Sequence, residues 1–331
     1  MPPVGFGGGM RRREFLGVLG GAAAWSAAAR AQAPGRVYRI GYMATTPRRP
    51  PTFAILLDEL RLAGFIEGQN LTVLEGGFGT TGNELAAATT ALVEATPDAI
   101  FTPGFATTMA AQTATKTIPI VAISEDLIAE GLASSLARPD HNTTGISLLS
   151  FDLDGKRGEF LLEAIPGLRH VAVLADPIVD SSAHLQALTD SAKARGASLS
   201  VFSARTPEEI VPALDAAKSS GAGAINVLAT QLFFFNRQLV IERTRELRLP
   251  AIYQWPDLAE QGGLIGYGPR FTELFRLLGR QLAKILRGTN PADIPIEQPS
   301  RFELVVNLKT AREIGVEIPA NFLLRADKVI E

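Results

Sequence analysis

The stretch His170–Asp176, HVAVLAD, decides the fold class, because five apolar residues follow one another between two polar ones. A strand with one face in solvent alternates apolar and polar residues, whereas a strand covered on both faces is apolar throughout. This run therefore predicts a buried strand of a parallel sheet with helices on both faces.

Similar runs recur along the chain, with helix-length segments between most of them. The strand-like runs are VYRIGYM (37–43), LTVLE (71–75), DAIFTPG (98–104), IPIVAIS (118–124), TTGISLL (143–149), LSVFSA (199–204), AINVLAT (224–230) and PAIYQW (250–255). The segments of crossover-helix length are 53–63, 83–95, 106–116, 183–195, 207–220 and 236–247. Gly64 and Gly196 follow two of them, as helix stops do. The pattern predicts a βα repeat wound twice, that is, an α/β protein with two Rossmann-like lobes.

A natural break between the lobes lies in LLSFDLDGKRG (148–158), with five βα units before it and four after it. Asp152 or Asp154 is expected to cap the helix that starts there. We expect lobe 1 to hold 32–150 with about 270–300, and lobe 2 to hold 151–269 with about 301–331. Two such lobes, joined by a hinge, leave a cleft between them, and parallel sheets place ligands at the carboxyl ends of their strands.

The amino-terminal stretch RRREFLGVLGGAAAWSAAARAQA (11–33) indicates export. Arg12 and Arg13 precede one variable residue and then Phe-Leu, which is the twin-arginine pattern, and the weakly apolar run that follows is too short for a membrane span. Cleavage is expected after Ala31, so that residues 1–31 form the signal peptide and the mature protein is periplasmic. Met10 directly precedes the arginines and is an alternative start. An arginine-rich amphipathic helix is disfavoured, because the run has no polar face.

Composition and motifs argue against several classes of function. The 331-residue chain has no Cys and a formal net charge of -2, so no disulfide framework, no cysteine metal site and no nucleic-acid partner are expected. GFGTTG (77–82) formally matches a dinucleotide motif, but Asp98 would begin the next strand and so lie at the opposite edge of the sheet from a ribose. The three histidines, His141, His170 and His184, show no metal spacing, and no carboxylates cluster near them in the sequence. No metal and no cofactor are expected.

The residues that follow the predicted strands are hydroxyls, amides, carboxylates and aromatics with no nucleophile and base pair among them, which is typical of a binding site. The helix after Gly104 could receive a carboxylate on its first amides. Helix capping is the alternative role for Thr45, Asp126 and Asp176, and core packing is the alternative for Trp255 and is favoured for the aromatic run 233–235. The candidate ligand-binding residues are Thr45, Thr46, Phe105, Ala106, Thr107, Ser124, Asp126, Asp176, Thr230, Gln231, Gln254, Trp255 and Tyr267.

Three stretches carry a resemblance to a known family: GLASSLARPDHNTTGIS (131–147), LRLPAIYQWPDLAEQGGLIGYGP (247–269) and the carboxyl-terminal segment 297–331. The mature chain resembles the ABC-transporter substrate-binding proteins related to the tryptophan/tyrosine-type periplasmic binding proteins. The resemblance implies the type I periplasmic-binding-protein fold, closure of two lobes around one solute, and delivery to an ABC permease in the inner membrane. It implicates Thr45, Thr107, Asp126, Asp176, Thr230 and Trp255 as ligand contacts.

The sequence departs from the family pattern at the expected pocket. Gly104-Phe105-Ala106 stands where Gly-Thr-Pro is common, Glu125-Asp126-Leu127 where Gly-Asp-Pro is common, and Thr230-Gln231 where Asp-Pro is common; Asp176-Pro177 replaces the usual Asn-Pro. The ligand is therefore left open between an amino acid and an aromatic or short-chain carboxylate. A monomeric, non-enzymatic component of an importer is expected. The alternatives are a periplasmic sensor that feeds a membrane receptor and, less favoured, an α/β isomerase.

Overall fold

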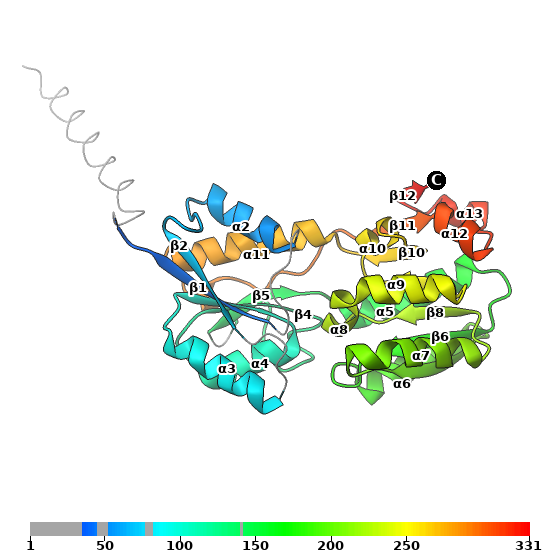
Figure 1. The fold of residues 1–331 in the computed structure, drawn as a ribbon, viewed down its shortest axis with the longest axis horizontal. Coiled ribbons are helices and arrows are strands. Elements are labelled where there is room, and N and C mark those ends of the chain that lie inside the picture. Colours follow the sequence, from blue (N-terminus) through cyan, green and yellow to red (C-terminus); the bar gives the residue numbers. More distant parts are fainter. Residues whose placement is uncertain (1–34, 45–51, 77–81, 140–141) are drawn as a thin grey trace, which may run out of the picture.

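The computed structural model describes residues 35–44, 52–76, 82–139 and 142–331, and it contains two sheets, each with helices on both faces (Figure 1). The run HVAVLAD forms the buried strand that its composition predicts, β6 (His170–Ala175). The six predicted helix ranges agree with observed helices to within two residues at each end. These segments follow the sequence pattern because continuous apolar strands are stable only when helices cover both faces of the sheet.

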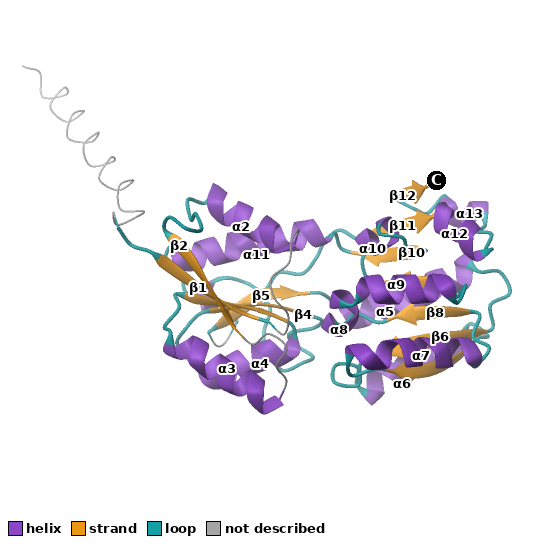
Figure 2. Cartoon of the chain, in the orientation of Figure 1, coloured by secondary structure: helices purple, strands orange, loops and turns teal. Residues whose placement is uncertain are grey.

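Lobe 1 is built on a five-stranded parallel sheet with the order β2-β1-β3-β4-β5. Ile40 and Tyr42 pack toward the helices of one face, whereas Met43 packs toward those of the other, as the twofold period of a strand requires. Figure 2 shows the two pairs of helices, α2 with α11 and α3 with α4, on opposite sides of the sheet. The elements are β1 (Tyr38–Met43), α2 (Thr52–Leu62), β2 (Leu71–Gly76), α3 (Gly82–Glu94), β3 (Ala99–Pro103), α4 (Phe105–Ala114), β4 (Ile120–Ser124), β5 (Thr143–Ser147) and α11 (Phe271–Leu286).

Lobe 2 is built on a seven-stranded sheet with the order β12-β11-β10-β9-β8-β6-β7. All neighbouring strands are parallel except β10 and β11, which are antiparallel because the chain leaves the lobe after β10 and re-enters it from lobe 1. Its strands after β6 are β7 (Ser198–Ser203), β8 (Ala224–Val227), β9 (Ala251–Tyr253), β10 (Ile265–Gly268), β11 (Glu303–Asn307) and β12 (Lys328–Ile330). Its helices are α5 (Ser150–Ala164), α6 (Ser182–Ala194), α7 (Pro207–Ser219), α8 (Gln231–Phe235), α9 (Arg237–Glu246), α10 (Pro256–Glu260), α12 (Leu308–Ile314) and α13 (Ala320–Leu323).

The chain crosses between the lobes three times: between β5 and α5, between β10 and α11, and between Glu297, which bridges to Ile146 of β5, and β11. We propose that the lobes divide at these crossings, with 32–150 and about 270–300 in lobe 1 and the rest of the mature chain in lobe 2. The helix after the first crossing is not capped by Asp152 or Asp154, and that prediction is wrong. Leu149 occupies the N-cap position with a left-handed φ of 56°, and Asp154 instead pairs with Arg157.

Helix α11 follows lobe 2 in the sequence but packs against α2 of lobe 1 (Figure 1). Gly279 permits this close packing: a Cβ at that position would lie 2.6 Å from the Cβ of Glu59 and 3.1 Å from the carbonyl oxygen of Leu56. Through this packing the amino-terminal turn of α11 lies at the boundary of the two lobes, where it contributes to the cavity described below.

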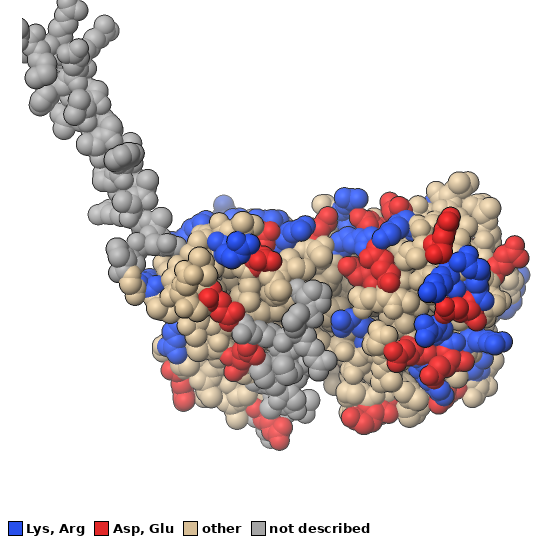
Figure 3. Space-filling model, turned by 45° about the horizontal axis from the view of Figure 1, so that its top comes forward, with Lys and Arg blue, Asp and Glu red and all other residues tan. Residues whose placement is uncertain are grey.

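Charged side chains of both signs are interspersed on the face of the molecule shown in Figure 3. Within the described residues, no helix is long and apolar enough to cross a membrane. The predicted export segment, with Arg12 and Arg13, lies outside the described residues.

Candidate functional site

A cavity between the two lobes lies at the carboxyl ends of the strands, and its empty space is about 600 Å³, open solvent included. Both lobes line it, which is the position expected for a ligand in a two-lobed α/β protein. Its lining residues are Tyr42, Phe53, Phe101, Pro103, Gly104, Ile123, Glu125, Leu148, Phe271 and Phe275 from lobe 1, and Thr230, Gln231, Phe234, Phe235, Gln254 and Trp255 from lobe 2.

Aromatic rings form a continuous wall across the lobe boundary. Phe234 of α8 stacks on Phe271 of α11, with centroids 4.5 Å apart and planes inclined by 9°, and Trp255 meets the same Phe271 edge-on at 5.3 Å. Phe275 continues the wall from Phe271 at 4.7 Å toward Phe101. Because aromatic pairs in these geometries are favourable beyond their buried area, the wall stabilises contact between the lobes and offers an apolar surface to a solute.

A second contact between the lobes joins Gln231 to the loop after β3. The side-chain amide of Gln231 donates a hydrogen bond to the carbonyl oxygen of Pro103. Gly104, with a φ of 91°, has no space for a side chain, since a Cβ there would lie 2.6 Å from Cδ of Gln231. Gln231 therefore covers the position before α4 at which the sequence analysis expects a carboxylate to bind.

Glu125 is the buried acid of the cavity. Burial and, to a lesser extent, the neighbouring carboxylate of Glu130 together raise the pKa of its carboxyl to about 8, against the hydrogen bond that Ser124 donates. Burial likewise raises the pKa of Glu130, whose Oε2 accepts a hydrogen bond from the Ser124 hydroxyl. Glu125 is thus held largely neutral near pH 7 as long as no cation lies beside it.

Two buried polar atoms of the cavity residues have no hydrogen-bond partner among the described residues: Oε1 of Gln254 and Nε1 of Trp255. Both side chains are buried, at 5% exposure each. A buried polar group without a partner costs about 1–3 kcal/mol, so that a solute able to satisfy both atoms regains this energy on binding.

The structure brings four of the predicted site residues together in this cavity, namely Thr230, Gln231, Gln254 and Trp255. Thr230 caps α8 by accepting a hydrogen bond from the amide of Phe233. Thr45 and Thr46 lie outside the described residues. The cavity lining does not include Phe105, Ala106, Thr107, Ser124, Asp126, Asp176 or Tyr267.

Those other residues serve local structure. The hydroxyl of Thr107 donates to the carbonyl oxygen of Pro103, and Asp126 accepts hydrogen bonds from the amides of Ile128 and Ala129. Asp176 accepts from the amide of Ile178 in a turn and does not cap α6, whose N-cap is Ser181, and burial raises the pKa of its carboxyl. Tyr267 packs edge-on against Phe160 in the core of lobe 2, with centroids 4.7 Å apart. Phe105 and Ala106 pack against the core of lobe 1, and the hydroxyl of Ser124 donates a hydrogen bond to the carboxyl of Glu125.

The sequence analysis missed most of the aromatic wall. Tyr42 and Phe101 lie inside strands, where it considered only residues after strand ends, and Phe271 with Phe275 lies one turn apart on α11, a signal that was available. The favoured core role for the aromatic run 233–235 is correct only for Phe233, which is 2% exposed. Phe234 and Phe235 line the cavity instead, because the short helix α8 lies at the lobe boundary and turns one face toward it.

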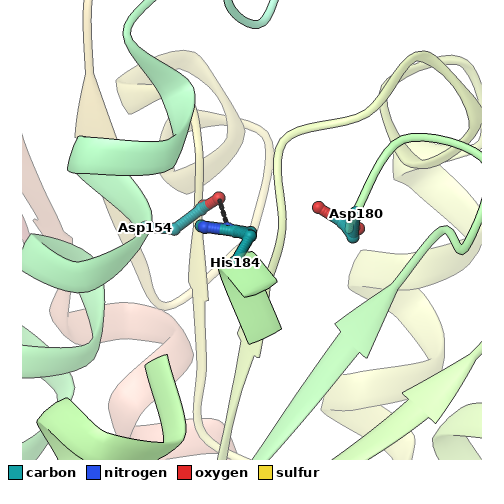
Figure 4. Close-up of side chains that lie close together, drawn as sticks. All are labelled: Asp154, Asp180 and His184. Atoms are coloured by element: carbon teal, nitrogen blue, oxygen red, sulfur yellow. Dashed lines mark hydrogen bonds and ion pairs between the residues drawn. The ribbon is translucent and has the colours of Figure 1, made fainter. Parts of the chain in front are cut away.

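A cluster of ionisable residues in lobe 2 corrects a further expectation. Asp154 of α5 and Asp180 lie close to His184 of α6, with ligand atoms all within 4.8 Å of one another, so carboxylates do gather near a histidine (Figure 4). Asp180 lies only four residues before His184, whereas Asp154 is distant in sequence and comes to them because α5 packs against α6. Nε2 of His184 lies 3.1 Å from Oδ2 of Asp154, whose other oxygen pairs with Arg157. The guanidinium group thereby supplies the positive charge that a metal ion would bring.

The glycine-rich motif has no supporting acid at the expected place. Asp98 lies just before β3, where it accepts a hydrogen bond of 2.7 Å from the amide of Arg39 and pairs with Arg36. This is the amino edge of the sheet, as predicted, and it is the edge opposite to the cavity. Residues 77–81 of the motif lie outside the described residues.

Comparisons with known proteins agree with this architecture. Residues 56–330 match the family model described as ABC transporter substrate binding protein. No curated protein matches the sequence. Among solved structures, a conserved domain protein from Vibrio cholerae O1 biovar El Tor is 23% identical with a TM-score of 0.78, and the match covers 89% of this chain and 100% of that one.

Two further structures place the fold. An ABC domain in complex with L-Trp from Streptococcus pneumonia is 21% identical with a TM-score of 0.75, covering 89% of this chain and 100% of that one. A periplasmic binding protein/LacI transcriptional regulator from Alkaliphilus metalliredigens, complexed with D-xylulofuranose, is 12% identical with a TM-score of 0.54, covering 80% and 96%. The predicted two-lobed type I periplasmic-binding-protein fold is thereby confirmed.

Proposed function

Because this chain belongs to the ABC transporter substrate-binding protein family, we propose that it is the solute-binding component of an ABC importer, which encloses one small organic solute and delivers it to a membrane permease. The observation that carries the proposal is the cavity at the lobe boundary, to which both sheets contribute the carboxyl ends of their strands. A solute held there contacts both lobes at once, and its binding energy therefore favours the closed arrangement over the open one.

The contacts across the boundary support a closure mechanism. The stacking of Phe234 on Phe271 and the hydrogen bond from Gln231 to Pro103 both join lobe 2 to lobe 1, and both are lost when the lobes separate. The three crossing segments are the hinge in this proposal. Because these two direct contacts between the lobes are small, solute binding determines whether the open or the closed form is favoured. A carrier that must release its solute requires such a balance.

We assign solute contact to Thr230, Gln231, Gln254 and Trp255 from the predicted set, and to Glu125 and the aromatic wall in addition. Thr45 and Thr46 remain proposed contacts, since they directly follow the end of β1. Thr107, Asp126 and Asp176 act by holding the loops that carry the cavity. The eight aromatic rings favour a solute with a flat apolar part, and the L-Trp bound to the Streptococcus pneumonia protein supports including aromatic compounds among the candidates.

Export completes the proposal. The twin-arginine segment 1–31 is proposed to direct the folded chain to the periplasm, where it works as a monomer and meets its permease. Replacement of Arg12 and Arg13 by Lys should leave the protein in the cytoplasm, which fractionation of the cells would measure.

A screen of thermal unfolding tests solute binding directly. The full chain is measured against indole and phenyl compounds, amino acids, short carboxylates and sugars. A solute at 100 times its dissociation constant should add about 2.7 kcal/mol of stability, a shift of a few degrees for a protein of this size. Small-angle X-ray scattering should then show a smaller radius of gyration with the solute than without it. A folded protein that no class stabilises, and that never contracts, contradicts the proposal.

A further inference from the structure

We propose that the solute of this cavity is an organic cation: an arylalkylamine, whose protonated nitrogen lies on the side chain of an aromatic ring, without a carboxylate. The inference deepens the proposed function and rests on it. Its basis is the presence of one acid, and of no Lys, Arg or His, among the described residues that line the cavity.

The charge of the cavity lining is one-sided. Among its described residues, Glu125 is the only acid, and none is Lys, Arg or His. The acceptors that await a partner are the carboxyl of Glu125 and the buried Oε1 of Gln254. A protonated amine can pair with the Glu125 carboxylate that it stabilises and can donate to the Gln254 amide oxygen, whereas a carboxylate placed there finds no Lys, Arg or His among the described residues of the lining.

The surroundings of Glu125 add to this preference. Glu130 and Asp154 both interact electrostatically with Glu125, as does Asp180. Of the positive or protonatable groups in this region, Arg157 and His184 are both engaged with Asp154, and the Arg157 pair is buried at 1% exposure on each side. Arg157 is thus engaged with the buried Asp154, so that a cationic solute would supply the counter-ion of an ionised Glu125.

The first amides of α4, which could receive a carboxylate, follow Gly104, and the side chain of Gln231 lies against that glycine and binds the carbonyl oxygen of Pro103. The indole nitrogen of Trp255 is a further donor of the cavity, and it is neutral. The aromatic wall, in contrast, suits a cation, because the face of a ring attracts a nearby positive charge.

Binding of such a cation should change the number of protons bound to the protein. Burial keeps Glu125 protonated near neutral pH, and an ammonium group beside it would stabilise the carboxylate. An amine should therefore displace a proton from the protein when it binds at pH 7, whereas a neutral ring should not. Calorimetry of one ligand in buffers of different ionisation enthalpy counts the protons released.

The test uses four indoles with the same ring and a short side chain at the same position: tryptamine, tryptophan, 3-indolepropionic acid and 3-ethylindole, with phenethylamine and 3-phenylpropionic acid as a second ring series. Titration calorimetry of the full chain at pH 7 should give tryptamine at least tenfold tighter binding than tryptophan or the acid, with release of a fraction of a proton. The variant Glu125→Gln should lose at least tenfold in affinity for tryptamine and keep its affinity for 3-ethylindole. Glu273→Gln, which removes an acid of α11 outside the cavity lining, is the matched control and should change neither affinity.

The outcomes separate the two proposals. If tryptophan or an acid binds more tightly than the corresponding amine, the inference about the cation is overturned while the binding function stands. The same holds if Glu125→Gln weakens tryptamine and 3-ethylindole equally, because Glu125 then supports the cavity rather than the charge. If no member of either ring series binds, the inference about the cation is overturned, whereas the binding function falls only if the thermal-unfolding screen also finds no solute in any other class.

Discussion

Phe234 of α8 lies flat against Phe271 of α11, with ring centroids 4.5 Å apart, so that one stacked pair joins the two lobes beside the cavity. The two residues belong to different lobes, although α11 follows lobe 2 in the sequence. The stacked rings contribute to closure and to the cavity wall at the same time. A change in either ring should therefore alter solute binding more than it alters folding.

Phe271→Ala should weaken solute binding at least tenfold, because it removes the ring that contacts Phe234, Trp255 and Phe275. Aromatic pairs contribute about 0.5–1.5 kcal/mol each beyond their buried area. Calorimetry measures the affinity, and scattering measures the loss of closure. Phe302→Ala, a phenylalanine of lobe 2 that meets Tyr267 at 6.3 Å, is the control and should leave both unchanged. Equal loss in the two variants would mean that the stacked pair has no special part in closure.

Gly104→Ala should shift the protein toward the open form, because the new Cβ would lie 2.6 Å from the side chain of Gln231. The backbone at Gly104, with φ 91° and ψ 170°, lies in a region that is essentially restricted to glycine, so Gly104→Ala also adds backbone strain of about 1–3 kcal/mol. Gly131→Ala, where φ is 71° and no atom lies within 4 Å of the new Cβ, is the control for a positive φ without a contact. Both variants should lose thermal stability, but only Gly104→Ala should have an increased radius of gyration and weaker solute binding. Equal scattering curves for the two variants would contradict the role of the Gln231 contact.

Trp255→Phe should weaken solute binding without lowering the thermal stability of the protein. The indole nitrogen of Trp255 is buried without a partner among the described residues, so its removal relieves a desolvation cost while the ring still packs on Phe271. The melting temperature should be equal to or above that of the parent protein, while affinity falls for any solute that accepts the indole hydrogen bond. A variant that loses stability and keeps full affinity would show that Trp255 is only a core residue.

The stability of lobe 2 should fall as the pH rises from 5 to 8.5. Burial and, to a lesser extent, the charge of Asp154 together raise the pKa of Asp180 from 3.8 to about 8, and one oxygen of its carboxyl has no hydrogen-bond partner among the described residues. The folded protein therefore holds a proton that the unfolded chain has released. The resulting stability is complete below the unfolded pKa and is lost as the pH rises through the folded one.

Asp180→Asn removes this dependence, because the amide oxygen can still accept the hydrogen bond from the amide of Asp176 and no longer ionises. Between pH 5 and 8.5 the free energy of unfolding, measured with urea, should fall by at least about 1 kcal/mol less in the variant than in the parent protein. Asp190→Asn, an exposed position of the helix α6 that follows Asp180, should follow the parent curve. Parallel curves for Asp180→Asn and the parent protein would contradict the buried, protonated state of Asp180.

The fold was open to prediction because its signals are local. Continuous apolar runs such as HVAVLAD, separated by helix-length segments that end at Gly64 and Gly196, leave few arrangements other than parallel sheets with helices on both faces. The capping expectation for Asp152 and Asp154 failed, since the chain turns there through Leu149 in a left-handed conformation. No sequence rule predicts that a leucine adopts it.

The candidate site was less accessible from the sequence. Strand ends pointed to Thr230, Gln231, Gln254 and Trp255, which the structure gathers in one cavity. Tyr267 satisfied the same criterion, but its side chain points to the core of lobe 2, because successive residues of a strand face opposite sides. The aromatic wall depends on how α11 packs against α2. The residues next to α11 in the sequence do not indicate this packing.

The sequence by itself determined the two-lobed α/β architecture, the ranges of nine strands and six helices, and the family, since each depends on local periodicity or on motifs read along the chain; it gave no ranges for β10, β11, β12 or α11. Only the tertiary structure decided what the cleft contains. Phe271 comes to Phe234 because Gly279 lets α11 pack on α2, and Glu125 becomes a buried acid because its neighbours exclude water. These properties arise from desolvation and from contacts between residues far apart in the chain, and neither exists before the lobes come together.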